Sequence, residues 1–133
     1  MLEVSGDIVF AVYDADKLCK PFTNEFDSTK SLEKGYKVTS IRPGIEKNVL
    51  ICKNSFSGYE EQRNAFEKTA RIFCQNQECI RGIIREYEEV SLTLQLRSDS
   101  AQIGTLIPKE FIRTVNDLEL DIDVDIISSG MVE

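Results

Sequence analysis

Four acidic residues alternate with apolar residues near the end of the chain, and their types and spacing have the clearest potential for chemistry. Glu119, Asp121, Asp123 and Asp125 lie between aliphatic neighbours throughout residues 118–126. Strict alternation of polar and apolar residues predicts a β-strand, in which residues two apart point to the same face, about 6.5–7 Å from each other. The sequence therefore predicts a strand over residues 118–126 with a ladder of four carboxylates on one face.

The negative charge of the chain is concentrated in the same region. Residues 110–133 contain seven acids against one base, a local excess of six, whereas the whole chain of 133 residues has a net charge of −7. Asp117 precedes the ladder and belongs to the same acidic segment. The acidity is therefore a local feature that requires its own explanation.

Three interpretations of the acidic strand remain open. In the first, the strand presents a solvated outer face, and its charge keeps an edge strand from pairing with other chains. In the second, the carboxylates form a docking surface for a cationic partner, since binding would relieve the repulsion among them. In the third, they form a divalent metal site, because Asp121-x-Asp123-x-Asp125 resembles the start of a calcium loop. Ile126 and Val132, however, stand where that loop requires Gly and Glu.

The sequence lacks the residues of the common catalytic mechanisms. The chain has no histidine, which excludes the most frequent general base and every Ser-His-Asp or Cys-His arrangement. It has neither a glycine-rich dinucleotide motif nor a phosphate-binding loop. The spacing of its four cysteines fits no common zinc site: Cys19, Cys52, Cys74 and Cys79. We expect a protein that is not an enzyme, with no catalytic residues, no metal and no cofactor.

Charge and hydropathy restrict the partners and the compartment. With 23 acidic against 16 basic residues, the chain should repel nucleic acid and anionic membranes and attract a basic protein. It contains no apolar run of about 18 residues, which a membrane-spanning helix would need. Its first residues show neither a basic start nor a long apolar stretch, so we expect no signal peptide and a cytoplasmic location.

The elements that must position these residues follow from hydrophobic periodicity. Residues 1–133 are expected to form a single α+β domain. Its antiparallel or mixed sheet should have about five strands, with two to four helices mainly on one face. A ferredoxin-like relative is one form of this architecture. Residues 22–34 are expected to be a loop, and Gly6 to mark a bulge. Strands are predicted over residues 2–13, 36–41, 48–53, 90–97 and 118–126, and helices over 14–20, 59–74, 78–86 and 108–115.

Short motifs at both ends of the chain carry a family resemblance. They are Gly6-Asp7, Thr29-Lys30, Lys34-Gly35, Leu106-Ile107-Pro108-Lys109-Glu110-Phe111 and Leu118-Glu119-Leu120-Asp121-Ile122-Asp123. Together they resemble a family of small bacterial proteins of unassigned function. The resemblance implies no catalytic residues, and it implies that the matching positions serve turns and packing.

The overall profile is similar to that of immunity proteins in bacterial toxin–immunity pairs, including those of contact-dependent growth inhibition. That similarity implies a non-catalytic protein that binds and neutralises a cognate, basic, nuclease-type toxin domain. Its expected contact residues are Asp117, Glu119, Asp121, Asp123 and Asp125. The alternative is a regulatory or adaptor domain that binds a small ligand or a housekeeping protein. The sequence leaves the oligomeric state open.

Overall fold

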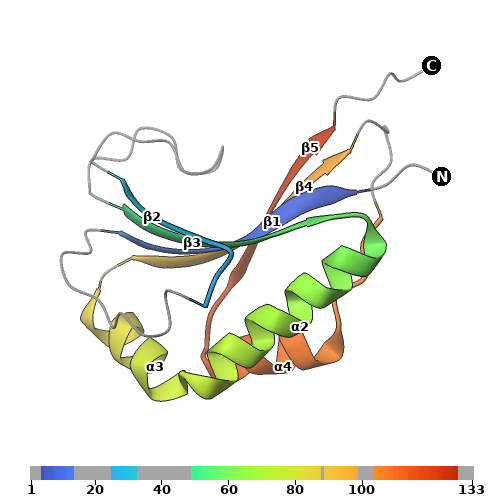
Figure 1. The fold of residues 1–133 in the computed structure, drawn as a ribbon. Helices are drawn as coiled ribbons and strands as arrows, with labels where there is room; N and C mark the ends of the chain where they lie inside the picture. Colours follow the sequence, from blue (N-terminus) through green and yellow to red (C-terminus); the bar gives the residue numbers. More distant parts are fainter. Residues whose placement is uncertain (1–3, 14–24, 33–48, 88, 99–103, 129–133) are drawn as a thin grey trace.

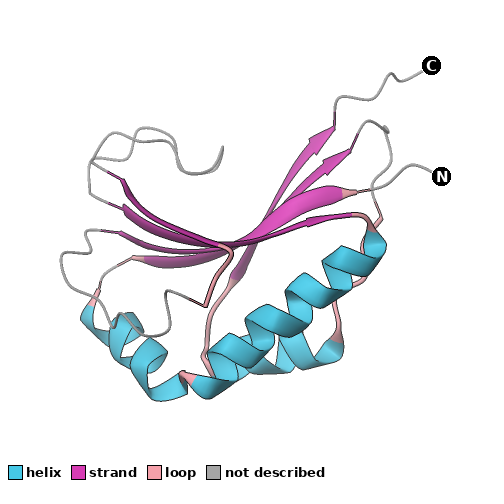
Figure 2. Ribbon diagram, in the orientation of Figure 1, coloured by secondary structure: helices cyan, strands magenta, loops and turns pink. Residues whose placement is uncertain are grey.

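The computed structural model describes residues 4–13, 25–32, 49–87, 89–98 and 104–128. Within them, five strands form one mixed sheet in the order β2-β3-β1-β4-β5 (Figures 1 and 2). β1 is central and antiparallel to β3 and β4, β2 is antiparallel to β3, and β5 is parallel to β4. The predicted α+β class is confirmed. The strands are β1 (Ser5–Tyr13), β2 (Ser28–Leu32), β3 (Val49–Ser57), β4 (Val90–Ser98) and β5 (Ile122–Ser128).

The helices of the described residues cover one face of this sheet (Figure 2). They are α2 (Tyr59–Gln75), α3 (Gln77–Glu86) and α4 (Lys109–Asp117). β3 and β4 are parallel because each pairs antiparallel with β1, so α2 and α3 form a crossover that passes over β1. α4 forms the next crossover, from β4 to β5. Both crossovers run across the sheet toward the edge formed by β5. Crossovers between parallel strands are almost always right-handed, so two crossovers that run in the same direction place their helices on the same face of the sheet.

The order β2-β3-β1-β4 agrees with the ferredoxin-like form of the prediction, which is built from split βαβ units. In a split unit, two parallel strands are joined by a helical crossover and are separated by a third, antiparallel strand. Here the crossover through α2 and α3 joins β3 to β4, and β1 lies between them, antiparallel to both. β5, which is parallel to β4, extends the sheet beyond this arrangement.

The core lies between the sheet and the helices. Phe10 of β1 packs edge-to-face on Phe73 of α2 with ring centroids 5.5 Å apart, and Phe66 packs the same way on Phe111 of α4 at 4.8 Å. β1 is also buried on its other face, where Val9 belongs to a second, smaller apolar cluster. A strand buried on both faces reads as a continuous apolar run, which is why residues 8–13 show no alternation.

Gly6 does not form the predicted bulge, because β1 keeps an unbroken register with β3 and β4 through this position. A glycine is needed there for a different reason. A Cβ at Gly6 would lie 1.9 Å from the backbone oxygen of Gln95 and 2.9 Å from the ring of Phe56. The close approach of the neighbouring strand backbone leaves no room for a side chain.

A polar network connects the start of β2 to β3 and α2. The buried Asn54 side chain accepts a hydrogen bond from the Asp27 backbone N–H at 3.0 Å and donates one to Thr69 Oγ1 at 2.8 Å. The Asp27 carboxylate accepts from the Ser55 backbone N–H at 2.9 Å and pairs with Lys68 at 2.6 Å. These contacts explain why residues 28–32, of which all but Leu32 are polar, form a strand at the end of the sheet order where the sequence predicted a loop.

The remaining elements agree with the sequence to different degrees. β3, β4, α2, α3 and α4 lie where hydrophobic periodicity predicts them, with ends displaced by a few residues. The predicted strand over residues 36–41 and the predicted helix over residues 14–20 lie outside the described residues. The last strand begins later than predicted, and this displacement reshapes the acidic site.

Candidate functional site

The end of α4 is a Schellman turn built on a non-glycine residue. The Leu120 N–H donates to the Val115 carbonyl at 3.2 Å, and the Glu119 N–H donates to the Asn116 carbonyl at 3.0 Å. Glu119 has a φ of 57°, in the left-handed region that this turn requires and that glycine usually supplies. The turn buries Leu118 and partly buries Leu120. Apolar residues two apart are therefore both directed inward, although neither lies in a strand.

This turn corrects the predicted ladder of four carboxylates. β5 begins at Ile122, so only Asp123 and Asp125 lie on the strand and share a face. Glu119 lies in the turn and Asp121 directly before the strand, while Asp117 is the exposed last residue of α4. The alternation at Leu118 and Leu120 comes from the helix end rather than from a β-strand, which is why it was misleading.

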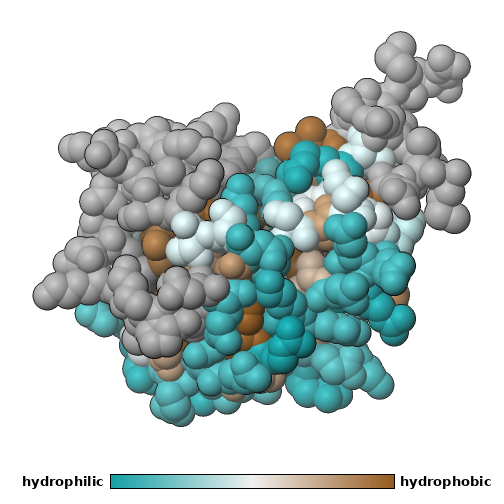
Figure 3. Space-filling view, in the orientation of Figure 1, coloured by the Kyte–Doolittle hydropathy of each residue, from teal (hydrophilic) through white to brown (hydrophobic). Residues whose placement is uncertain are grey.

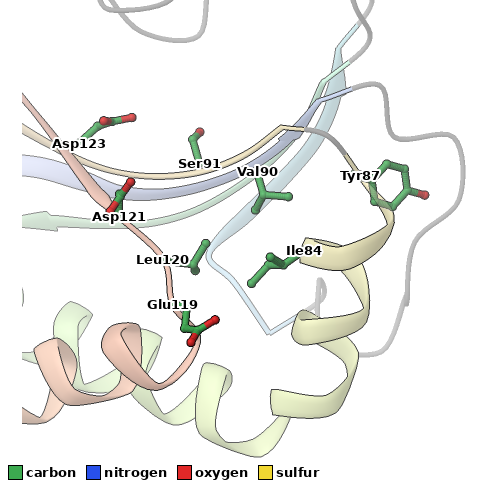
Figure 4. A pocket seen from close by; sticks show the side chains of 8 residues that line it. All are labelled: Ile84, Tyr87, Val90, Ser91, Glu119, Leu120, Asp121 and Asp123. Atoms are coloured by element: carbon green, nitrogen blue, oxygen red, sulfur yellow. The ribbon is translucent and has the colours of Figure 1, made fainter.

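The turn nevertheless brings three of the five predicted residues to one cavity. Glu119, Asp121 and Asp123 line a cavity of about 230 Å³ at the point where β5 begins beside β4 (Figure 4). Asp117 and Asp125 do not line it. The other lining residues come from the end of α3, the start of β4 and the Schellman turn: Ile84, Tyr87, Val90, Ser91 and Leu120.

The cavity has an apolar side and a polar side. Ile84, Val90 and Leu120 pack against the main core on the helix side of the sheet. Figure 4 shows Ser91 pointing to the opposite side from Val90, toward the side where Asp121 and Asp123 lie. This arrangement follows from strand geometry, because successive residues of β4 point to opposite faces.

The three acidic side chains of the cavity have no countercharge in the part of the chain that the structure describes. Within residues 4–13, 25–32, 49–87, 89–98 and 104–128, no Lys or Arg nitrogen lies within 4.0 Å of Glu119, Asp121 or Asp123. Elsewhere the situation differs: Asp7 accepts from Arg97 at 3.1 Å, and Asp27 pairs with Lys68. Uncompensated negative charge therefore collects around the cavity.

Ser91 is the cavity residue that sequence reasoning missed. The residue is only 5% exposed, and its Oγ has no hydrogen-bond partner in the described part of the chain. A buried polar group without a partner costs about 1–3 kcal/mol of stability. In the sequence, Ser91 is an ordinary polar position of an alternating strand, so no local signal distinguishes it from solvent-facing serines.

The carboxylates are spread around the cavity rather than gathered at one point. Among the described residues, no group of three or more Asp, Glu, Cys or His side chains is close enough together to hold a metal ion. The divalent-metal interpretation of the acidic segment therefore gains no support from this geometry. A larger cation, with several donors, would be needed to reach the separated oxygens.

An exposed apolar strand edge adjoins the cavity. β5 is the last strand in the sheet order, and one of its edges pairs with no strand among the described residues. Val124, Ile126 and Ile127 of this strand are 46%, 56% and 52% exposed. Figure 3 shows hydrophobic surface in the region where Figure 1 places the end of β5. Acidic and apolar groups thus lie next to one another along a single strand.

No family model, curated protein or solved structure matches the chain. No helix among the described residues is long and apolar enough to cross a lipid bilayer. The case for a function therefore depends on the geometry and charge of the site.

Proposed function

We propose that the chain is a non-catalytic binding protein that docks a basic protein partner at the acidic cavity. The observation that carries the proposal is the set of three acidic side chains around one cavity, without a cation in the described part of the chain. The carboxylates repel one another, and a positively charged partner would replace repulsion with attraction. Close charge pairs across protein interfaces have coupling energies of about 1.5–7 kcal/mol.

The strand edge beside the cavity would supply the apolar part of the interface. Stable interfaces combine a desolvated apolar centre with a polar rim. Val124 and Ile126 are exposed although they pair with Leu94 and Leu96, which the helices bury. A partner that covers β5 would bury this apolar surface while it contacts the cavity. The net charge of −7 would also accelerate the encounter with a basic protein.

We propose further that the function takes the form of immunity: the protein acts in the bacterial cytoplasm and neutralises a cognate, basic, nuclease-type toxin domain. The acidic character, the lack of histidine and the uncompensated carboxylates all support a protein that acts by binding. The alternative, a regulatory domain for a small ligand, receives less support from the cavity. Its volume of about 230 Å³ is below the range of roughly 300–1,000 Å³ that is typical of small-molecule sites.

Binding measurements on matched charge variants test the docking proposal. A tagged chain captures partners from its source cell, mass spectrometry identifies them, and calorimetry measures the affinity of the purified partner. Asp121→Asn with Asp123→Asn should weaken binding by about 2 kcal/mol, a roughly 30-fold loss. Glu60→Gln with Glu67→Gln removes the same charge from exposed positions of α2 that do not line the cavity, and should change affinity less than threefold. Equal losses in both double variants would contradict docking at the cavity.

Growth measurements test the immunity form separately. Expression of the captured partner alone should arrest growth, and co-expression of this chain should restore it. The Asp121→Asn, Asp123→Asn variant should restore growth less well than the α2 control variant. If the partner is harmless when it is expressed alone, the immunity proposal is contradicted and an adaptor role remains.

A further inference from the structure

We infer that the acidic cavity is an anchor site for one arginine side chain of a protein partner. This inference rests on the proposed function, because the basic partner supplies the arginine, and it adds the chemical group that enters the cavity. Three observations on the cavity lead to it: a buried hydroxyl for which the described residues offer no partner, an apolar side, and separated carboxylates.

The first observation is the Ser91 hydroxyl. Its Oγ is buried, has no hydrogen-bond partner in the described part of the chain, and belongs to a residue that lines the cavity beside Asp121 and Asp123. A hydroxyl can donate or accept, so it does not select a ligand by itself. Asp121 and Asp123 decide the polarity, because ionised carboxylates only accept hydrogen bonds. The ligand group must therefore carry several N–H donors and a positive charge.

The second observation is the apolar side of the cavity and its size. Ile84, Val90 and Leu120 offer aliphatic surface on the helix side. Arginine and lysine both lay their methylene chains along such surface and keep the charged group among polar atoms. A cavity of about 230 Å³ accommodates a side chain rather than a nucleotide or a folded segment. Tyr87 also lines the cavity, and a guanidinium group stacks on an aromatic ring.

The third observation is the separation of the carboxylates, which distinguishes arginine from lysine. Glu119 reaches the cavity from the turn after α4, and Asp123 reaches it from β5. Where the structure describes the chain, no three acidic side chains come together closely enough for a metal ion. A lysine ammonium group is a compact point charge, whereas the guanidinium group spreads five donors over a planar fork. Such a fork pairs with two acceptors at once, which a point charge does not do with the same geometry.

Titration of the full chain with model compounds tests the anchor directly. The probes are N-acetyl-arginine amide and N-acetyl-lysine amide, followed through the backbone amide signals of the ¹⁵N-labelled protein. We expect saturable shifts from the arginine probe at residues 84, 91 and 120, with an affinity at least fivefold higher than that of the lysine probe. Glu60→Gln should leave the arginine affinity unchanged, because Glu60 does not line the cavity.

Variants of Ser91 provide a second readout that a purely structural role would not produce. Ser91→Ala should weaken binding of the arginine probe at least threefold without lowering the melting temperature, because it removes a hydroxyl that has no hydrogen-bond partner among the described residues. Ser91→Cys keeps nearly the same volume but has a weaker hydrogen-bonding group, so it should also weaken binding of the arginine probe. It replaces the alanine variant in the test if that variant folds poorly.

The possible outcomes separate this inference from the docking proposal. Equal affinities for the two probes, shifts spread over the whole acidic surface, or an arginine affinity unaffected by both Ser91 variants would overturn the arginine anchor. The docking proposal would still stand if partner binding continued to depend on Asp121 and Asp123. Conversely, if arginine binds selectively but the affinity of the protein partner does not depend on Asp121 or Asp123, the docking proposal is contradicted at this site.

Discussion

Replacement of Glu119 by glycine should stabilise the fold and weaken the proposed interaction at the same time. Glu119 holds a φ of 57°, a left-handed conformation that costs a residue with a Cβ about 1–2 kcal/mol. Glycine avoids this cost but loses about 0.5–1 kcal/mol more than alanine through the entropy of the unfolded chain. The balance is a gain of roughly 0.5–1 kcal/mol in the free energy of unfolding, or about 2–4 °C in melting temperature. The same substitution removes one of the three acidic side chains that line the cavity.

Urea unfolding of Glu119→Gly and Glu119→Ala isolates the backbone contribution. Both substitutions remove the carboxylate, but Glu119→Ala keeps a Cβ in the left-handed conformation. We expect the glycine variant to be more stable than the alanine variant by about 0.5–1 kcal/mol, with both binding the basic partner more weakly than the wild type. A glycine variant no more stable than the alanine variant would refute the reasoning, because the turn would then impose no conformational cost on Glu119.

Three further predictions concern the elements that support the site. Gly6→Ala should lower the free energy of unfolding by about 3 kcal/mol, because the new Cβ would lie 1.9 Å from the backbone oxygen of Gln95. Urea unfolding measures this loss, and a near-neutral effect would contradict the close approach of the two strands. Phe66→Ala should cost about 3–5 kcal/mol in the same measurement, since Phe66 is fully buried, and a loss below about 1 kcal/mol would contradict its core position. Burial raises the pKa of Asp27, but the hydrogen bond from Lys68, the Ser55 N–H and the Lys68 charge outweigh it and hold the pKa below its ordinary value of 3.8. A lowered pKa in the folded state contributes stability that is present above the unfolded value and is lost as the pH falls through the folded value. Asp27→Asn should therefore destabilise the protein at pH 7 by less than about 1 kcal/mol, because the ion pair is partly exposed, and should reduce the loss of stability below about pH 4. Thermal melts of both proteins from pH 2 to 7 measure this, and parallel curves would contradict the role of Asp27.

Elements that depend on local patterns were predictable from the sequence. The alternation after Val90 predicts β4, and helical spacing after Tyr59 predicts α2, because both patterns record which side of the element is buried. The acidic segment was also recognisable, and three of its residues line the cavity. The end of α4 was missed, since the turn carries Glu119 where a glycine would have marked the helix end.

Sequence alone determined the composition of the site: an acidic segment, no histidine, and the apolar periodicities that select an α+β sheet covered by helices. Only the tertiary structure decided how that segment is presented. The crossover through α4 places Glu119 and Asp121 beside the start of β4, and burial leaves the Ser91 hydroxyl without a partner in the described part of the chain. These features arise from contacts between residues about 30 positions apart, and a local pattern contains no record of such distant neighbours.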